Sequence, residues 1–224
     1  MSTSRQFERL AAELCAAPIS DRRDAVAAEI ATMVRFSGTA SAVGGEIRIE
    51  STPRASGAAE RLSKLIHSAA DHPVQVMREV AAGRPASVRA GGRAAGEVAR
   101  SVGLLSPFNT AVVGLPAWLV TAAAGDVEVA GAALRGAALA AGGLISRDDH
   151  KAALVIGCPG LPAAMALRAV VRGAAGSALI REPGLLGGEG YRLIVWDRHG
   201  LGQVLTAMSA DRFAARVEEL STRA

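Results

Sequence analysis

The sequence is poor in aromatic residues, in lysine and in cysteine. Aromatic side chains make up 3% of its 224 residues, so the core that it predicts is aliphatic. Half of the residues are hydrophobic and 21% are charged, a composition that buries a core and excludes wholesale disorder. The two cysteines, Cys15 and Cys158, exclude a disulfide scaffold and a four-cysteine zinc site, and they favour a reducing cytoplasm.

Neither a secretory signal nor a membrane span is predicted. The first residues, MSTSRQFERLAAEL, are polar and lack the apolar centre of a signal peptide. Residues 101–125 carry no charge, but Gly103, Pro107, Gly114 and Pro116 interrupt any helix there. This stretch therefore predicts a buried connector.

The net charge is +4 and nearly all of the basic residues are arginine, since Lys64 and Lys151 are the only lysines. A basic balance favours an acidic partner such as nucleic acid. An arginine-rich coding bias explains the same composition, so both interpretations stay open.

Hydrophobic spacing and turn residues predict one order of elements that occurs twice. After an entry helix at 5–15, the first half is expected to contain helices at 21–37, 52–70 and 93–102 and strands at 39–43, 46–50, 73–80 and 86–90. The second half is expected to contain helices at 126–141, 159–174, 199–208 and 211–220 and strands at 144–147, 151–157, 177–182 and 191–197. The pattern predicts an α+β fold of two pseudo-symmetric αββαββα repeats.

The ends of the two leading helices set the predicted repeat. Ser20 and Asp126 are suitable N-caps, and Gly38 is suited to end the first helix in the left-handed conformation. An offset of 103 then aligns Gly38 with Ala141. The predicted divisions are a first repeat with its N-terminal helix at 1–105, an apolar connector at 106–125 and a second repeat at 126–224.

This order resembles that of double LAGLIDADG proteins, in which two central helices pack together and two sheets form a saddle for DNA. The second central helix carries Ala132, Gly136 and Ala140 along one stripe, which allows close helix packing. Glu29 and Met33 lie opposite on a bulkier first helix.

Several segments give a more specific resemblance. They are RRDAVAAEIATMVRFSG, VGGEIRIE, GEVARSVGLL, GLP at 114–116, ALRGAALAAGGL at 133–144, CPG at 158–160 and AAMAL at 163–167. In this order they resemble WhiA-type transcriptional regulators of sporulation and cell division. The resemblance implies a cytoplasmic protein, a WhiB-type iron–sulfur regulator as partner, and a C-terminal helix-turn-helix domain that this chain lacks.

LAGLIDADG nucleases need an acidic residue at the foot of each central helix, because a divalent cation requires carboxylate oxygens. The matching positions are Gly38 and Ala141, which offer no side-chain ligand. Asp148 and Asp149 lie farther on, in a predicted hairpin turn where aspartate is ordinary. The sequence therefore predicts no catalytic residue, metal or cofactor.

Other reactive groups give weak signals. The histidines are expected at the surface: His67, His72, His150 and His199. Cys158 precedes a predicted helix, where a thiol either has a lowered pKa or is a small buried residue, and no partner base favours the former. The segment GLLGGEG at 184–190 lacks the Lys-Ser/Thr of a phosphate loop and is expected to be a plain hairpin loop.

DNA binding is predicted at the polar strand positions of the saddle. The candidates are Arg48, Arg89, Arg181 and Arg192. Glu46 and Glu50 flank Arg48, so this face either binds DNA weakly or has lost DNA binding. Trp196, which shares a strand face with Arg192, either stacks on a base or belongs to the core.

Three functions follow, in decreasing order of support. The first is a non-catalytic domain of a WhiA-like regulator that acts by protein binding, weak DNA binding or both. The second is a stand-alone protein-interaction or antagonist module without DNA binding. The third is a DNA endonuclease, which the two residues at the helix feet disfavour.

Overall fold

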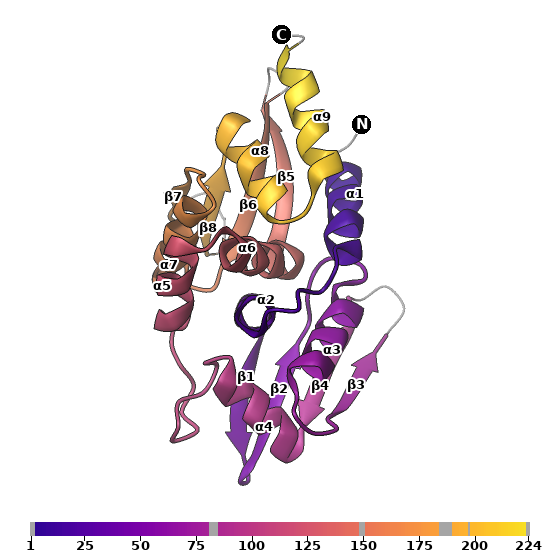
Figure 1. The fold of residues 1–224 in the computed structure, drawn as a ribbon, viewed down its shortest axis with the longest axis vertical. Helices are drawn as coiled ribbons and strands as arrows, with labels where there is room; N and C mark the ends of the chain where they lie inside the picture. The colour runs from indigo at the N-terminus through magenta and orange to yellow at the C-terminus, as the bar shows by residue number, and fades with distance from the viewer. Residues whose placement is uncertain (1–2, 81–84, 148–150, 184–189, 197, 223–224) are drawn as a thin grey trace.

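The computed structural model describes residues 3–80, 85–147, 151–183, 190–196 and 198–222, which fall into two similar halves (Figure 1). The first half, after α1 (Thr3–Ala16), comprises α2 (Arg23–Ser37), β1 (Gly38–Val43), β2 (Glu46–Ser51), α3 (Ala58–Ala69), β3 (Gln75–Glu79), β4 (Ser87–Gly91) and α4 (Gly92–Ser101). The second half, after α5 (Ala117–Gly125), comprises α6 (Val127–Ala141), β5 (Gly142–Arg147), β6 (Lys151–Cys158), α7 (Leu161–Gly173), β7 (Leu179–Arg181), β8 (Tyr191–Val195), α8 (Arg198–Ala207) and α9 (Asp211–Thr222).

Each half contains one antiparallel four-stranded sheet. The strand orders are β1-β2-β4-β3 and β5-β6-β8-β7, so the two sheets share one topology. In Figure 1, α3 and α4 cover one face of the first sheet, and α7 and α8 cover the corresponding face of the second. The predicted α+β class and the αββαββα repeat are confirmed.

The central helices α2 and α6 lie side by side between the two sheets (Figure 1). Gly136 of α6 faces α2 so closely that a Cβ there would lie 2.3 Å from Thr32 Oγ1 and 2.5 Å from the Glu29 carbonyl oxygen. Ala132 and Ala140 are buried on the same stripe. A small residue at position 136 is thus required for this helix packing.

The repeat is offset by 104 residues at the central helices, not by the predicted 103. Both helices have 15 residues, and they end at Ser37 and Ala141. The following strands begin at Gly38 and Gly142. The structural equivalent of Ala141 is therefore Ser37, and Gly38 corresponds to Gly142.

The predicted N-cap of α6 is confirmed and that of α2 is wrong. The Asp126 side chain accepts hydrogen bonds from the backbone N–H groups of Glu128 and Val129. Helix α2 instead begins at Arg23, because the Ser20 hydroxyl accepts from the Arg22 backbone N–H and donates to the Glu128 carboxylate. Gly38 is also not left-handed, since its φ of −174° is that of extended backbone entering β1.

The predicted helix at 52–70 begins six residues later, at Ala58. Residues before it bond to the ends of both central helices instead. The Thr52 N–H donates to the Ser37 carbonyl, and the N–H groups of Arg54 and Ala55 donate to the carbonyls of Ala140 and Leu139. This loop satisfies backbone groups that a helix end leaves unpaired, which accounts for its departure from helical form.

The predicted buried connector is only partly buried, and it contains a helix. Its second part forms α5, which packs on α7 so closely that a Cβ on Gly173 would lie 1.9 Å from the Ala123 carbonyl oxygen. Its first part exposes apolar side chains, with Phe108 90% and Val113 83% exposed. No helix in the described residues is both long and apolar enough to cross a membrane.

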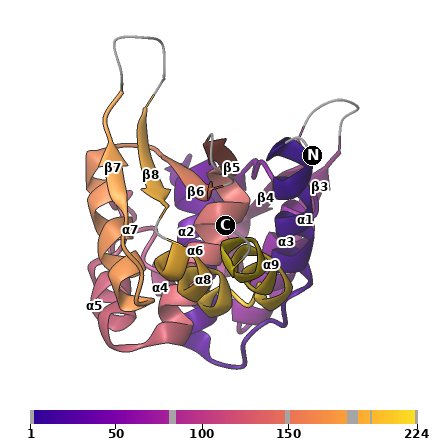
Figure 2. The same ribbon diagram turned by 90° about the horizontal axis from the view of Figure 1, so that it is seen from above.

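Helix α1 extends from the first half to the second. It lies beside α3 in Figure 2 and also contacts β5, α6 and α9. The Glu13 carboxylate accepts a 2.8 Å hydrogen bond from the backbone N–H of Arg212, at the start of α9. The N-terminal helix therefore joins both halves.

Candidate functional site

The feet of the central helices carry no carboxylate. The Ser37 hydroxyl donates to the Met33 carbonyl and lies 2.7 Å from the Ser51 hydroxyl. Ala141 is its counterpart on α6, and Gly38 and Gly142 follow. No residue at these four positions has an anionic side chain, whichever of the two offsets is used.

At Gly38 a side chain also has no room. A Cβ there would lie 1.9 Å from the Glu50 carbonyl oxygen and 2.6 Å from the Cα of Ser51. Both atoms belong to the backbone of β2, so an acidic residue at position 38 requires the strand to move. Within the described residues, no group of three or more His, Cys, Asp or Glu has the arrangement of a metal site.

The outer face of the first sheet is charged and internally paired. Arg48 Nη2 lies 3.5 Å from Glu46 Oε2, and Arg89 Nε lies 3.5 Å from Glu50 Oε1. Arg89 Nη1 also lies 2.9 Å from Glu79 Oε1. Three carboxylates therefore face two guanidinium groups, so this face offers no excess of positive charge to phosphates.

The outer face of the second sheet is apolar at the equivalent positions. Strand pairing defines a row of four residues across each sheet, starting from the second residue of β1 or β5. In the first sheet the row is Thr39, Glu50, Arg89 and Met77. In the second it is Gly143, Val155, Ile194 and Leu179. The charged pair at the centre of the first row is thus replaced by two aliphatic residues.

The two arginine candidates of the second sheet lie together. Arg181 of β7 and Arg192 of β8 are directly opposite in the strand pairing, and both are exposed. Within the described residues neither forms an ion pair with a carboxylate. Trp196 follows β8 on the same side and is 44% exposed, so the interpretation of Trp196 as a core residue is wrong.

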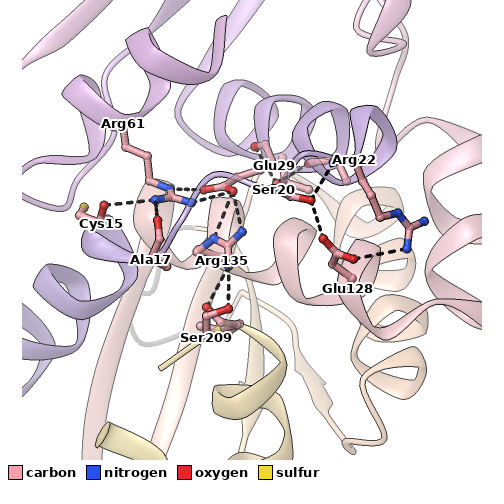
Figure 3. Close-up of polar contacts among 12 residues, drawn as sticks. Cys15, Ala17, Ser20, Arg22, Glu29, Arg61, Glu128, Arg135 and Ser209 are labelled. Atoms are coloured by element: carbon pink, nitrogen blue, oxygen red, sulfur yellow. Dashed lines mark hydrogen bonds and ion pairs between the residues drawn. The ribbon is translucent and has the colours of Figure 1, made fainter. Parts of the chain in front are cut away.

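A buried ionic network, which the sequence did not reveal, joins the two halves (Figure 3). Glu29 of α2 is 1% exposed and accepts hydrogen bonds from Arg61 of α3 and Arg135 of α6. The remaining donors bond to backbone: Arg61 Nη1 to the carbonyls of Cys15 and Ala17, and Arg135 Nη1 to that of Met208 at 3.1 Å. The Glu29 carboxylate and both guanidinium groups thus have hydrogen-bond partners, which buried charged groups require.

A second network joins the N-terminal ends of the central helices, on the surface. Arg22 Nη2 lies 2.6 Å from Asp24 Oδ2 and 2.7 Å from Asp126 Oδ2, and Nη1 lies 3.4 Å from Glu128 Oε2. Hydrogen bonds from Arg22 lower the pKa of both aspartates. Figure 3 shows Ser20 and Arg22 converging on Glu128.

The remaining candidates do not form a reactive site. Burial raises the pKa of the Cys158 thiol to about 11, and Cys158 ends β6 rather than starting a helix, so a lowered pKa is contradicted. His67 and His72 are exposed, as predicted. The predicted turn at Asp148 and Asp149, His150 and most of the loop at 184–190 lie outside the described residues, and the side chain of His199 is not described.

A hollow of about 730 Å³ lies between α2, α3, α4 and Trp118. Four carboxylates line it, those of Asp21, Asp24, Asp71 and Glu97, and Asp24 pairs with Arg22 and Asp71 with Arg23. Glu97, which also lines the hollow, pairs with Arg93 at 2.9 Å. Three of the four lining carboxylates are therefore already paired with arginine.

The architecture is that of a LAGLIDADG protein. It matches the homing endonuclease I-DmoI, solved in complex with DNA and Ca, with a TM-score of 0.58 and 13% identity over 89% of this chain and 100% of that one. The N-terminal LAGLIDADG domain of WhiA gives a TM-score of 0.61 and 18% identity over 90% of this chain and 89% of that one. Full-length WhiA from Thermatoga maritima gives 0.65 and 17% over 96% of this chain and 66% of that one.

Comparison of sequences also finds WhiA proteins, at higher identity than the solved structures. The chain is 36% identical over 199 residues to a probable cell division protein WhiA of Mycolicibacterium vanbaalenii, covering 88% of this chain and 58% of that protein. It is 36% identical over 195 residues to the protein of the same name from Mycobacterium leprae, covering 86% and 56%. No family model matches the chain.

The chain is a homologue of the WhiA cell division proteins and has the fold of their N-terminal LAGLIDADG domain. It spans a little over half the length of these relatives.

Proposed function

We propose that the chain is a non-catalytic LAGLIDADG-like domain of a WhiA-type transcriptional regulator of cell division and sporulation. It acts in the cytoplasm by binding protein and, weakly, DNA. The observation that carries this proposal is the absence of carboxylates at the feet of α2 and α6, at Ser37, Gly38, Ala141 and Gly142.

The chemistry of phosphodiester cleavage supports the proposal. Metal-dependent hydrolysis uses bound cations to activate a water molecule and to stabilise the leaving oxygen, and the cations need carboxylate ligands. Hydroxyl and methyl groups at the helix feet cannot replace those ligands. The lack of space for a Cβ at Gly38 argues further that this foot does not hold a cation.

The charge on the saddle supports weak DNA binding. Non-specific affinity for DNA comes from lysine and arginine contacts to phosphates. On the first sheet, Arg48 and Arg89 are already paired with three glutamates, and bringing phosphates there adds like charge. Arg181 and Arg192 on the second sheet remain for phosphate contacts.

A WhiB-type iron–sulfur regulator is the proposed partner, on the basis of the family resemblance. The second candidate function is a stand-alone protein-interaction or antagonist module without DNA binding, which the pairing of Arg48 and Arg89 with glutamates favours. Titration with duplex DNA separates the two candidates, since only the first predicts measurable binding at low salt.

Two measurements test the absence of catalysis. Isothermal titration with magnesium or manganese is expected to show no site tighter than millimolar, because no carboxylate pair lies between the helix feet. Incubation with supercoiled plasmid and either metal is expected to leave the plasmid uncut. Tight metal binding together with metal-dependent cleavage would overturn the proposal.

A further inference from the structure

The second sheet exposes an apolar surface on the face where the first sheet carries paired charges. Ile145, Val155, Leu179 and Trp196 form this surface, hereafter the apolar platform. Ile145 is 45%, Leu179 40% and Trp196 44% exposed. Strand pairing places Ile145 with Ala153, Val155 with Ile194, and Ile194 with Leu179 on one side of the sheet. Several large apolar side chains exposed together mark an interaction surface.

Comparison of the two halves shows that two of the platform positions are polar in the first sheet, whereas Met77, the counterpart of Leu179, is also apolar and is 56% exposed. Ser41 on β1 occupies the position of Ile145 on β5, and Glu50 that of Val155. The first sheet thus shows that polar residues suffice for folding at these two positions. The stability of the fold therefore does not by itself explain why the second sheet has apolar residues at these positions.

Two positive charges border the platform, and no carboxylate among the described residues forms an ion pair with either of them. Arg181 and Arg192 face each other across β7 and β8, two residue pairs beyond Leu179 and Ile194 and on the same side of the sheet. Like charges directly opposite in a sheet are destabilising, and a bound anion between them removes that cost. The pseudo-symmetric pair in the first sheet is Glu79 opposite Ser87, which carries no such repulsion.

The platform and the arginine pair together select the kind of partner. We propose that this surface binds an amphipathic segment of another protein, whose apolar side chains cover the platform and whose carboxylates bind Arg181 and Arg192. This inference rests on the proposed function, and specifies its protein partner by chemistry. Buried apolar and aromatic contacts supply most of the affinity at such sites, while the charged groups set orientation.

Nucleic acid fits the same surface less well. Phosphates over Ile145, Val155 and Leu179 would lose water without gaining a hydrogen-bond donor. The glutamates at 46, 50 and 79 on the other half of the saddle repel a duplex that spans both sheets. Single strands stack on successive aromatic residues, and the platform has a single aromatic residue, Trp196.

Peptide selection tests the proposal. Random peptides of about a dozen residues, displayed on phage, are selected against the immobilised chain and counter-selected against Trp196→Ala/Arg192→Glu. The expected peptides place two or more large apolar residues next to aspartate or glutamate. A selection that yields no peptide, or peptides rich in lysine and arginine, would overturn the proposal.

Titration of one selected peptide by fluorescence anisotropy assigns the surface. Trp196→Ala and Arg192→Glu are each expected to weaken binding about tenfold, and so is replacement of the peptide carboxylates by amides. Met77→Ala and Arg89→Glu on the first sheet are the matched controls and are expected to change affinity less than about twofold. Circular dichroism verifies that each variant is folded.

Two results would contradict this assignment. One is equal affinity of the peptide for the wild type, the platform variants and the first-sheet controls. The other is displacement of the peptide by an oligothymidine with a dependence on Trp196, which would assign the platform to single-stranded nucleic acid. Failure of the proposed function is seen separately, as metal-dependent cleavage of DNA.

Discussion

Glu29 of α2 and Arg135 of α6 form a buried ion pair, with Arg135 Nη2 2.8 Å from Glu29 Oε2, at the contact between the two halves. Both residues are at most 5% exposed. Arg61 binds the same carboxylate from α3, so one anion holds two guanidinium groups. Through the further bonds of these groups, the network fixes α2 and α6 relative to the segments before α2 and after α8.

Replacing Glu29 by glutamine is expected to destabilise the fold by about 3–5 kcal/mol, because two buried cations lose their counter-charge. Chemical denaturation measures the change. Glu46→Gln is the control, since its pair with Arg48 is half exposed and is worth at most about 1 kcal/mol. Equal losses in the two variants would mean that the buried network is not a major determinant of stability.

Gly136→Ala tests the close contact of the central helices. Alanine improves helix propensity by about 1 kcal/mol, but overpacking against Thr32 and the Glu29 backbone costs about 1–3 kcal/mol. A net loss of stability is expected. Gly125→Ala at the end of α5, where no atom lies within 4 Å of a Cβ, is expected to be neutral or stabilising. A Gly136→Ala variant as stable as the control would show that the helices are farther apart.

Arg22→Gln tests the surface network at the helix N-termini through its pH dependence. Hydrogen bonds from Arg22 lower the folded-state pKa of Asp24 and Asp126. A lowered carboxyl pKa contributes stability above the unfolded-state value, near 3.9, and this contribution is lost as the pH falls through the folded-state pKa. The wild type is therefore expected to lose more stability between about pH 6 and pH 3 than Arg22→Gln.

Denaturation midpoints across that pH range measure the difference. Arg23→Gln removes an equal charge one residue away, where the pair with Asp71 is longer and highly exposed. It is expected to retain the acid sensitivity of the wild type. Identical pH profiles for the wild type and Arg22→Gln would refute the assigned role of Arg22.

Gly38→Asp places a carboxylate at the foot of α2. The variant is expected to lose at least about 1–3 kcal/mol of stability, because its Cβ overlaps the β2 backbone at Glu50 and Ser51. It is also expected to cut no plasmid. Gly143→Ala on β5, where a Cβ meets open space, is the control for glycine replacement in a strand. A stable Gly38→Asp variant with magnesium-dependent cleavage would contradict this account.

The sequence predicts most of the element order because hydrophobic spacing and turn residues are local signals. Asp126 is recognisable as a cap, since its partners are the next two or three residues. Ser20 has the same chemistry, but its partner Glu128 is 108 residues away. Long-range competition of this kind also redirects residues 52–55 to the ends of α2 and α6.

The candidate surface is harder to predict from the sequence than the fold. Glu29 is an ordinary helix residue until Arg61 and Arg135, 32 and 106 positions away, are brought to it. Trp196 is apolar and follows a strand, which is typical of a core position, yet it lies just beyond the end of β8 and is 44% exposed. The asymmetry of the saddle emerges only when strand register aligns the two sheets.

Residual DNA binding is expected to depend more on Arg192 than on Arg48. Arg48 is paired with Glu46, whereas Arg192 lies beside Arg181 without a carboxylate partner in the described residues. Arg192→Ala should weaken binding equally for all sequences, since phosphate contacts carry no sequence information. Parallel titrations of both variants at low salt measure this. A larger loss for Arg48→Ala would reverse the assignment.

Fluorescence-anisotropy titration of the chain with unrelated duplexes at near-physiological salt, followed by a salt series, tests most directly that the saddle does not read DNA. The account predicts equal and weak binding, with dissociation constants at the weak end of about 10⁻⁴–10⁻⁶ M that rise steeply with salt. Nanomolar affinity for one duplex over the others would contradict it, because the saddle itself would then recognise sequence.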